Sequence, residues 1–224
     1  GYPATTLNDI LDEVGCSKGS FYHHFESKRQ VLQAISDQRT LAAYEAYAQT
    51  PAPDGIAQLN RLLYFASPLR KGEEAYLASM LSLARDDEAS MIESHRRQSV
   101  KKGFYSDLLG LLKRMQEEGE VTLFSEPMAE LLWDGYMAFF GTILSEGVRL
   151  MDSGGTPASR AVDLLRAARL HWERMLLLPW GSVVIVEADE LVNTLQAALR
   201  LVSGQEGQLR FDSGFAAPCQ QLGD

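Results

Sequence analysis

Residues 17–29 hold the side chains of this sequence best suited to a polyanionic partner. Basic residues outnumber acidic ones here, which gives the segment a net charge of +2 in a chain whose total is −9. Small and hydrogen-bonding side chains accompany these charges: Ser17, Lys18, Gly19, Ser20, Tyr22, His23 and Lys28. Donors of this kind suit phosphate oxygens, and small residues permit close approach. Because the whole chain is acidic, any contact with nucleic acid must come from this local patch.

Two short helices joined by a tight turn must position these side chains. The first is predicted to follow Thr6, its N-cap, and to end at Gly15. Its apolar residues follow the helical period: Leu7, Ile10, Leu11 and Val14. The second is predicted over 17–24, and it directs Phe21 and Phe25 inward. This pair predicts a helix-turn-helix.

The string TTLNDILDEVGCSKGSFYHHFESK, residues 5–28, closely resembles the DNA-binding domain of TetR-family transcriptional regulators. The resemblance is strong over residues 1–40. A weaker family-like feature is the turn QEEGEV at 116–121. Domains of this family begin with one more helix, which we expect to be missing ahead of Gly1.

The resemblance implies a role for each residue of the motif. Ser17 to His23 would lie in the major groove, where Lys18 would donate to guanine O6 and N7. Gly19 would allow close approach, and Ser17 and Ser20 would touch bases or phosphates. Tyr22, with His23 beside it, and Lys28 would contact phosphates, and Thr6 would place its helix N-terminus on the DNA backbone.

The remaining sequence predicts an all-α, TetR-like protein of about nine helices. Beyond the first two, the expected ranges are 28–49, with Ser27 as N-cap, 54–66, 73–84, 87–118, 126–152, 158–178 and 188–203. The β-branched run 183–186 is interpreted as an extended linker. The predicted domains are a helix-turn-helix domain at 1–45 and a helical effector-binding and dimerisation domain at 46–203. An irregular tail at 204–224 follows.

The resemblance also implies a mostly apolar ligand pocket inside the helical body. Met and aromatic side chains are the candidates, although such residues at helical spacing are more often plain core. They are Tyr64, Phe65, Tyr76, Met80, Met91, Phe104, Leu108, Met115, Trp133, Tyr136, Met137 and Phe140. His95 and His171 are possible polar pocket groups. The cluster Arg96, Arg97, Lys101 and Lys102 is interpreted as a solvated helix face.

A dimer interface is predicted on the helices at 126–152 and 158–178, which carry a large apolar face. In the family two late helices form an intermolecular four-helix bundle. The candidate residues are Leu132, Phe139, Ile143, Leu144, Val148, Val162, Leu165, Trp172 and Leu176. The alternative is that they form the core of one protomer.

Several classes of function receive no support from the sequence. It has no phosphate-binding glycine loop, no nucleophile elbow and no metal-ligand spacing, so we expect no enzyme activity, no cofactor and no metal. Two cysteines, Cys16 and Cys219, fit a reducing cytoplasm. The longest apolar run, 135–145, is shorter than the roughly 20 residues needed to cross a bilayer.

Together these features predict a homodimeric, ligand-responsive transcriptional regulator. We expect a repressor that binds a palindromic double-stranded DNA operator through residues 18–24 and is released by a small, apolar effector. The alternative is a small-molecule binding module without regulated DNA binding.

Overall fold

The computed structural model describes residues 25, 27–84, 89–122, 125–153 and 158–204. Within these ranges the chain forms seven α-helices and no strand, which confirms the predicted all-α class. The helices are α3 (Lys28–Gln49), α4 (Gly55–Ala66), α5 (Glu74–Leu83), α6 (Ala89–Glu117), α7 (Glu126–Ser153), α8 (Ala158–Met175) and α9 (Ala188–Val202). The helix predicted between Thr6 and Gly15, the helix predicted at 17–24 and the tail at 205–224 lie outside the described residues.

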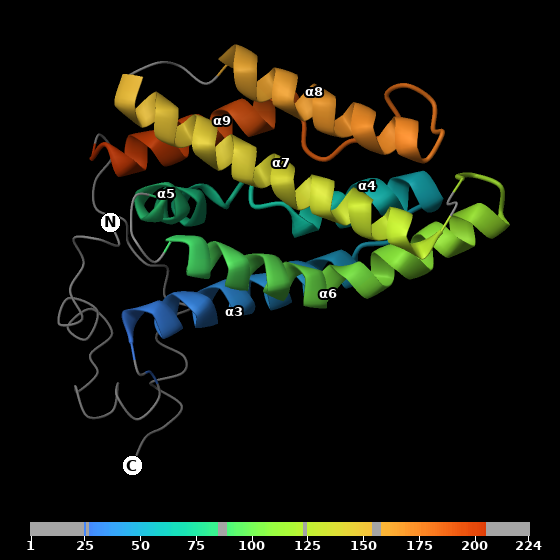
Figure 1. Ribbon diagram of the computed structural model, residues 1–224, viewed down its shortest axis with the longest axis horizontal. Helices are drawn as coiled ribbons and strands as arrows, with labels where there is room; N and C mark the ends of the chain where they lie inside the picture. Colours follow the sequence, from blue (N-terminus) through green and yellow to red (C-terminus); the bar gives the residue numbers. More distant parts are fainter. Residues whose placement is uncertain (1–24, 26, 85–88, 123–124, 154–157, 205–224) are drawn as a thin grey trace.

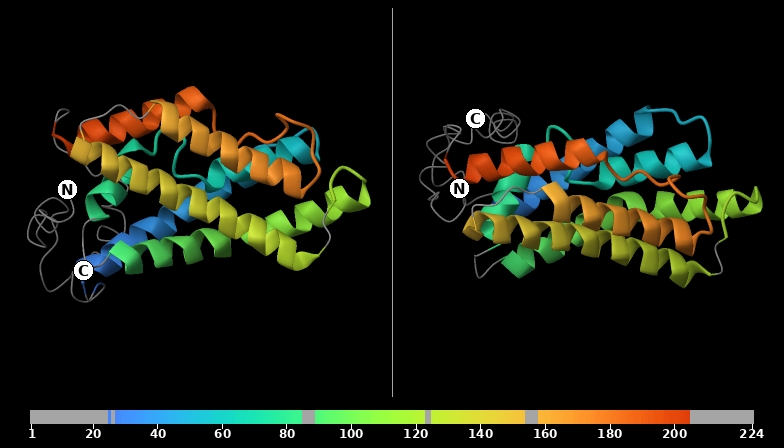
Figure 2. Two further views of the ribbon diagram at one scale, coloured as in Figure 1. Left: turned by 45° about the horizontal axis from the view of Figure 1, so that its top comes forward. Right: turned by 90° about the horizontal axis from the view of Figure 1, so that it is seen from above.

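The helices pack as pairs around α7 (Figure 1). α3 lies against α6 on one side of α7, and α8 lies against α7 on the other. α9 packs on α5 and also contacts α8 (Figure 2). This arrangement places α7, the most apolar long helix, at the centre of the molecule.

Aromatic side chains of α7 form the middle of the core. Trp133, Tyr136 and Phe140 are each 1 % exposed, and the rings of Tyr136 and Phe140 meet edge-on at 4.5 Å. Trp172 of α8 contacts the same Tyr136 ring at 6.3 Å. The Tyr136 hydroxyl donates a hydrogen bond to the Leu63 carbonyl, so this buried polar group is satisfied.

Glycine ends α6 as its position in the sequence predicts. Gly119 has a φ of +76°, the left-handed conformation that glycine adopts without steric cost. The Glu120 N–H then donates back to the Met115 carbonyl at 2.8 Å, and the Gly119 N–H to the Gln116 carbonyl at 3.1 Å. These bonds satisfy carbonyls at the helix end that have no partner within the helix.

The end of α8 differs from the prediction. The helix stops at Met175 rather than at residue 178 because Leu177 adopts a φ of +55°. The Leu178 N–H donates to the Glu173 carbonyl at 2.8 Å, the same closing bond that follows Gly119. A leucine gives no signal for this turn, so the sequence did not reveal it.

The run 183–186 is an extended linker and not a strand, as predicted. Val183, Ile185 and Val186 are fully buried beneath the bundle. Asn60 of α4 holds the linker through two hydrogen bonds: its amide donates to the Ser182 carbonyl at 2.8 Å, and its oxygen accepts from the Val184 N–H at 2.9 Å.

None of the helices in these ranges has the length and hydropathy needed to cross a membrane. In the same residues no three His, Cys, Asp or Glu side chains come together as ligands of a metal ion.

Candidate functional site

The predicted nucleic-acid-binding segment leads directly into α3. Thr6, Ser17, Lys18, Gly19, Ser20, Tyr22 and His23 lie outside the described residues, and Lys28 is described only as the first residue of α3. Ser27 caps this helix as predicted, since its hydroxyl accepts a hydrogen bond from the Gln30 N–H at 3.3 Å. α3 is therefore the element that joins the predicted helix-turn-helix to the helical body.

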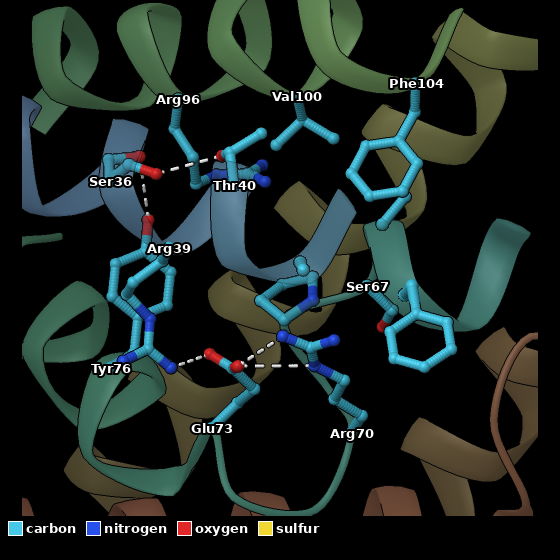
Figure 3. A pocket seen from close by; sticks show the side chains of 14 residues that line it. Ser36, Arg39, Thr40, Ser67, Arg70, Glu73, Tyr76, Arg96, Val100 and Phe104 are labelled. Atoms are coloured by element: carbon cyan, nitrogen blue, oxygen red, sulfur yellow. Dashed lines mark hydrogen bonds and ion pairs between the residues drawn. The ribbon is translucent and has the colours of Figure 1, made fainter. Parts of the chain in front are cut away.

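A cavity of about 40 Å³ lies between α3, the loop from α4 to α5, and α6 (Figure 3). Its lining combines charged and hydroxyl side chains with apolar ones. The polar lining includes Ser36, Arg39, Arg70, Glu73, Tyr76 and Arg96, and the apolar lining includes Phe65, Val100 and Phe104. A site of this volume has room for about three waters.

The carboxylate of Glu73 lies between two guanidinium groups (Figure 3). Arg39 of α3 donates to one oxygen. Arg70 donates to the other from Nη2 at 2.7 Å and from Nε at 3.2 Å. Glu73 is only 8 % exposed, so two cations share one buried anion. This group of three side chains carries an excess of one positive charge.

Arg39 has hydrogen-bonding capacity left over. Its guanidinium carbon lies 4.7 Å from the centre of the Tyr76 ring. The negative π face of the ring attracts the positive charge of the guanidinium. The Tyr76 hydroxyl lies 3.2 Å from Ser36 Oγ at the same end of the cavity. The Arg39 Nε, although buried, has no acceptor among the described residues. A buried donor without a partner is costly and uncommon.

Arg96 corrects the interpretation of a solvated basic face on α6. It is 2 % exposed and lies on the same side of α6 as Val100 and Phe104, which follow it at intervals of four residues. Its Nε and Nη2 each donate to Glu93 at 2.7 Å, and Arg97 donates to the same carboxylate at 2.9 Å. The bidentate bond to Glu93 makes the burial of this charge tolerable.

Burial and neighbouring charge shift the titration of this cluster. Burial lowers the pKa of Arg39 and of Arg70, and the charge of Arg39 lowers the pKa of Arg70 further. Burial alone would raise the pKa of Glu93, but hydrogen bonds and charges from Arg96 and Arg97 outweigh it, so that pKa is lowered. Both arginines of the Glu73 group would thus gain from another anion.

The residues predicted to line a ligand pocket separate into three groups. Phe65, Tyr76 and Phe104 line the charged cavity. Most of the others are buried core side chains: Met80, Leu108, Met115, Trp133, Tyr136, Met137 and Phe140. Tyr64 is partly buried and donates to Glu190 at 2.7 Å, and Met91 is 53 % exposed on α6.

An open groove of about 210 Å³ lies between α7 and α8. Small or aliphatic residues line one part of it: Gly135, Thr142, Leu164, Ala167 and Ala168. Larger side chains that the sequence singled out line the rest: Tyr136, Phe139, His171 and Trp172. A Cβ atom at Gly135 would lie 3.0 Å from His171 Nε2, so glycine lets the two helices approach closely. Small side chains leave room for a neighbouring helix.

Most residues predicted to form the dimer interface lie in the hydrophobic core of a single chain. Leu132, Ile143, Leu165, Trp172 and Leu176 are at most 1 % exposed, and Phe139 is 6 % exposed. Leu144, Val148 and Val162 are partly buried. A dimer through α7 and α8 would therefore rely on the outward residues of the groove, such as Thr142 and Ala167.

Sequence reasoning missed the charged group formed by Arg39, Arg70 and Glu73. Arg70 and Glu73 are three residues apart, but Arg39 comes from another helix 34 residues before Glu73. No spacing rule connects them, and charged residues on a predicted helix are ordinarily solvated.

The comparisons with known proteins concern the N-terminal segment. Residues 1–35 match the family model of the bacterial regulatory proteins, tetR family. An uncharacterised HTH-type transcriptional regulator in the lacX 3′ region of Lactococcus lactis subsp. lactis is 49 % identical over 37 residues, or 16 % of this chain and 19 % of that protein. The HTH-type transcriptional repressor KstR2 of Mycolicibacterium smegmatis is 49 % identical over 35 residues, 16 % of this chain and 17 % of that repressor.

A third relative is the transposon Tn10 TetC protein of Escherichia coli, 40 % identical over 50 residues, or 22 % of this chain and 25 % of that protein. The chain thus spans a quarter or less of the length of these curated relatives. The comparison with solved structures gives no significant match. The segment that matches the family model contains the predicted helix-turn-helix string, so residues 1–35 of this chain are similar to the tetR family of bacterial regulatory proteins.

Proposed function

We propose that this protein is a homodimeric transcriptional repressor that binds a palindromic operator and is released by a small-molecule effector. The observation that carries the proposal is the match of residues 1–35 to the family of regulators, since that segment contains the whole helix-turn-helix string. Two of the relatives that share it are named as an HTH-type regulator and an HTH-type repressor.

A homodimer is proposed because one short recognition helix reads too few bases. Two-fold symmetric helix-turn-helix proteins read two half-sites about 34–36 Å apart. The groove between α7 and α8 supports a self-complementary contact, since its small residues would accept the same helices of a second copy. Leu131, which is 62 % exposed on α7, adds apolar area to the outer surface of this helix.

The proposed effector site is the charged cavity beside α3. Arg39 of α3 is bound to Glu73, and Arg96 of α6 lines the same cavity. A ligand that changes these contacts would change the position of α3, which continues from the DNA-binding segment. The effector must bind the released state more tightly than the DNA-bound state, because equal affinity shifts no population.

The roles proposed for two lysines give a test of DNA binding. Lys18→Ala should relax base preference at one position of each half-site, because Lys18 is proposed to read a guanine. Lys28→Ala should weaken binding to all duplexes alike and reduce the salt slope by about one, because Lys28 is proposed to contact phosphate. Competition binding with single-base operator variants at two salt concentrations separates the two effects.

Lys113→Ala is the matched control, because this lysine lies at the far end of α6 and pairs with Glu126. It should change neither base preference nor salt slope. Identical behaviour of the Lys18 and Lys28 variants would contradict the assigned roles.

A further inference from the structure

We propose that the cavity between α3, the α4–α5 loop and α6 binds the carboxylate of a small monocarboxylic acid. This acid would be the effector of the regulator, so the inference rests on the proposed function. The sequence led us to expect an apolar effector. The charged lining points instead to an anion with a short apolar tail.

The balance of charge in the cavity carries this inference first. Arg39 and Arg70 share the single carboxylate of Glu73, while Arg96 and the more exposed Arg97 share that of Glu93. Arg39, Arg70 and Glu73 are therefore left with one uncompensated positive charge in a partly desolvated place. A ligand with one negative charge neutralises it.

A free donor marks where the carboxylate would lie. The Arg39 Nε is buried and has no acceptor among the described residues, although the Nη2 of the same group is bound to Glu73. The hydroxyls of Ser36 and Tyr76 lie at the same end of the cavity (Figure 3). The Nε–H of a guanidinium can donate a charge-assisted hydrogen bond to one carboxylate oxygen.

The excess charge favours a singly charged headgroup. A carboxylate carries one negative charge, which balances the one excess positive charge of the Glu73 group. A phosphate carries more than one negative charge at neutral pH, so it exceeds the excess charge.

Apolar side chains define where the rest of the acid would lie. Phe65, Val100 and Phe104 line the same cavity, and the guanidinium carbon of Arg70 lies 5.5 Å from the centre of the Phe65 ring. A short hydrocarbon chain would gain from covering this apolar surface, by about 0.8 kcal/mol for each buried CH₂ group. The geometry therefore favours an aliphatic acid of a few carbons over a free inorganic anion.

The test is isothermal titration calorimetry of the full chain with sodium butyrate and with butyramide, at an ionic strength held constant by sodium chloride. The amide has the same size and no charge. We expect butyrate to bind with a saturable, one-site isotherm and butyramide to bind at least about tenfold more weakly, because charge-assisted hydrogen bonds are worth this much. Inorganic phosphate at the same ionic strength should also bind more weakly than butyrate.

Two variants change the affinity for butyrate in opposite directions. Arg39→Gln removes the free donor and the excess charge, and should weaken binding at least about tenfold. Glu73→Gln removes the competing carboxylate, and should make binding several-fold tighter. Arg166→Gln on α8, where the side chain is 72 % exposed, is the control and should bind as the unchanged protein does.

Circular dichroism establishes that each variant is folded. If Arg39→Gln does not fold, the comparison of butyrate with butyramide and the sign of the Glu73→Gln effect still decide the question. The inference is overturned if butyrate does not bind, if the acid and the amide bind equally, or if Glu73→Gln weakens binding. None of these readouts contains DNA, so a chain that selects an operator but fails here leaves the proposed regulator intact.

Discussion

At the scale of single residues, the buried ion pair between Glu93 and Arg96 makes stability depend on pH. The pKa of Glu93 lies below its ordinary value of 4.5, because its arginine partners outweigh the effect of burial. The charged form is thus favoured by folding. Its contribution is complete above about pH 4.5 and is lost as the pH falls through the lowered folded-state pKa.

Glu93→Gln should therefore lower the free energy of unfolding by about 1–3 kcal/mol at neutral pH, since Arg96 loses its ionised partner. The difference from the unchanged protein should shrink as the pH falls from about 5 to about 3. Urea unfolding across this range measures it. Glu130→Gln, in the exposed pair with Lys101 at 3.6 Å, is the control. Parallel pH curves for Glu93→Gln and the unchanged protein would refute the assignment.

Residue types alone could not have predicted the charged cavity. The DNA-binding string is continuous in sequence, so its residues could be named without a structure. Arg39 and Glu73 meet only because α3 packs beside the loop that precedes α5, and that packing cannot be read from the spacing of the charged residues. Arg96 was assigned to solvent for the same reason, since its partner Glu93 gives no sign of burial.

At the scale of elements, caps and glycines predicted most helix boundaries. Ser27 and Asp54 accept hydrogen bonds from the backbone N–H groups three residues ahead, at 3.3 and 2.7 Å. α3 begins where Ser27 predicts, and α4 begins at Gly55, one residue after the predicted start. The end of α8 was missed because Leu177 occupies a position that glycine normally fills. A left-handed leucine costs about 1–2 kcal/mol, so the surrounding contacts must impose this turn.

Leu177→Gly should relieve this strain and raise the free energy of unfolding by about 1 kcal/mol. The leucine side chain is 66 % exposed, so little apolar burial is lost. Gly119→Ala, at the equivalent turn after α6, makes the opposite change. It should lower the free energy of unfolding by about 1 kcal/mol. Chemical denaturation of both variants is the measurement. A destabilised Leu177→Gly protein would show that its side chain stabilises the fold.

At the scale of the whole molecule, an apolar helix face can be predicted from sequence, but not what covers it. The stripe on α7 containing Leu132 and Ile143 was assigned to a second copy, and it lies in the core of one chain. The same periodicity arises in both cases, because burial by a neighbouring helix and by a partner protein select the same residues. The groove between α7 and α8 is lined partly by Phe139 and Trp172, which the sequence analysis did assign to a dimer interface, and partly by small residues that carry no such signal.

We propose that two copies of this chain bind DNA together through the segment that matches the regulator family. The most direct measurement is selection from a pool of random duplexes at two salt concentrations, with the unchanged protein and with Ala167→Arg. Ala167 is exposed in the groove, so a bulky charge there should block the dimer without disturbing the core. Ala48→Arg, an exposed position on α3, is the matched control.

We predict that the unchanged protein and Ala48→Arg enrich a palindrome with a steep salt dependence, while Ala167→Arg retains at most weak binding to one half-site. Sedimentation equilibrium should show a dimer for the first two proteins and a monomer for the third. Folded, dimeric protein that enriches no sequence at either salt concentration would contradict the account.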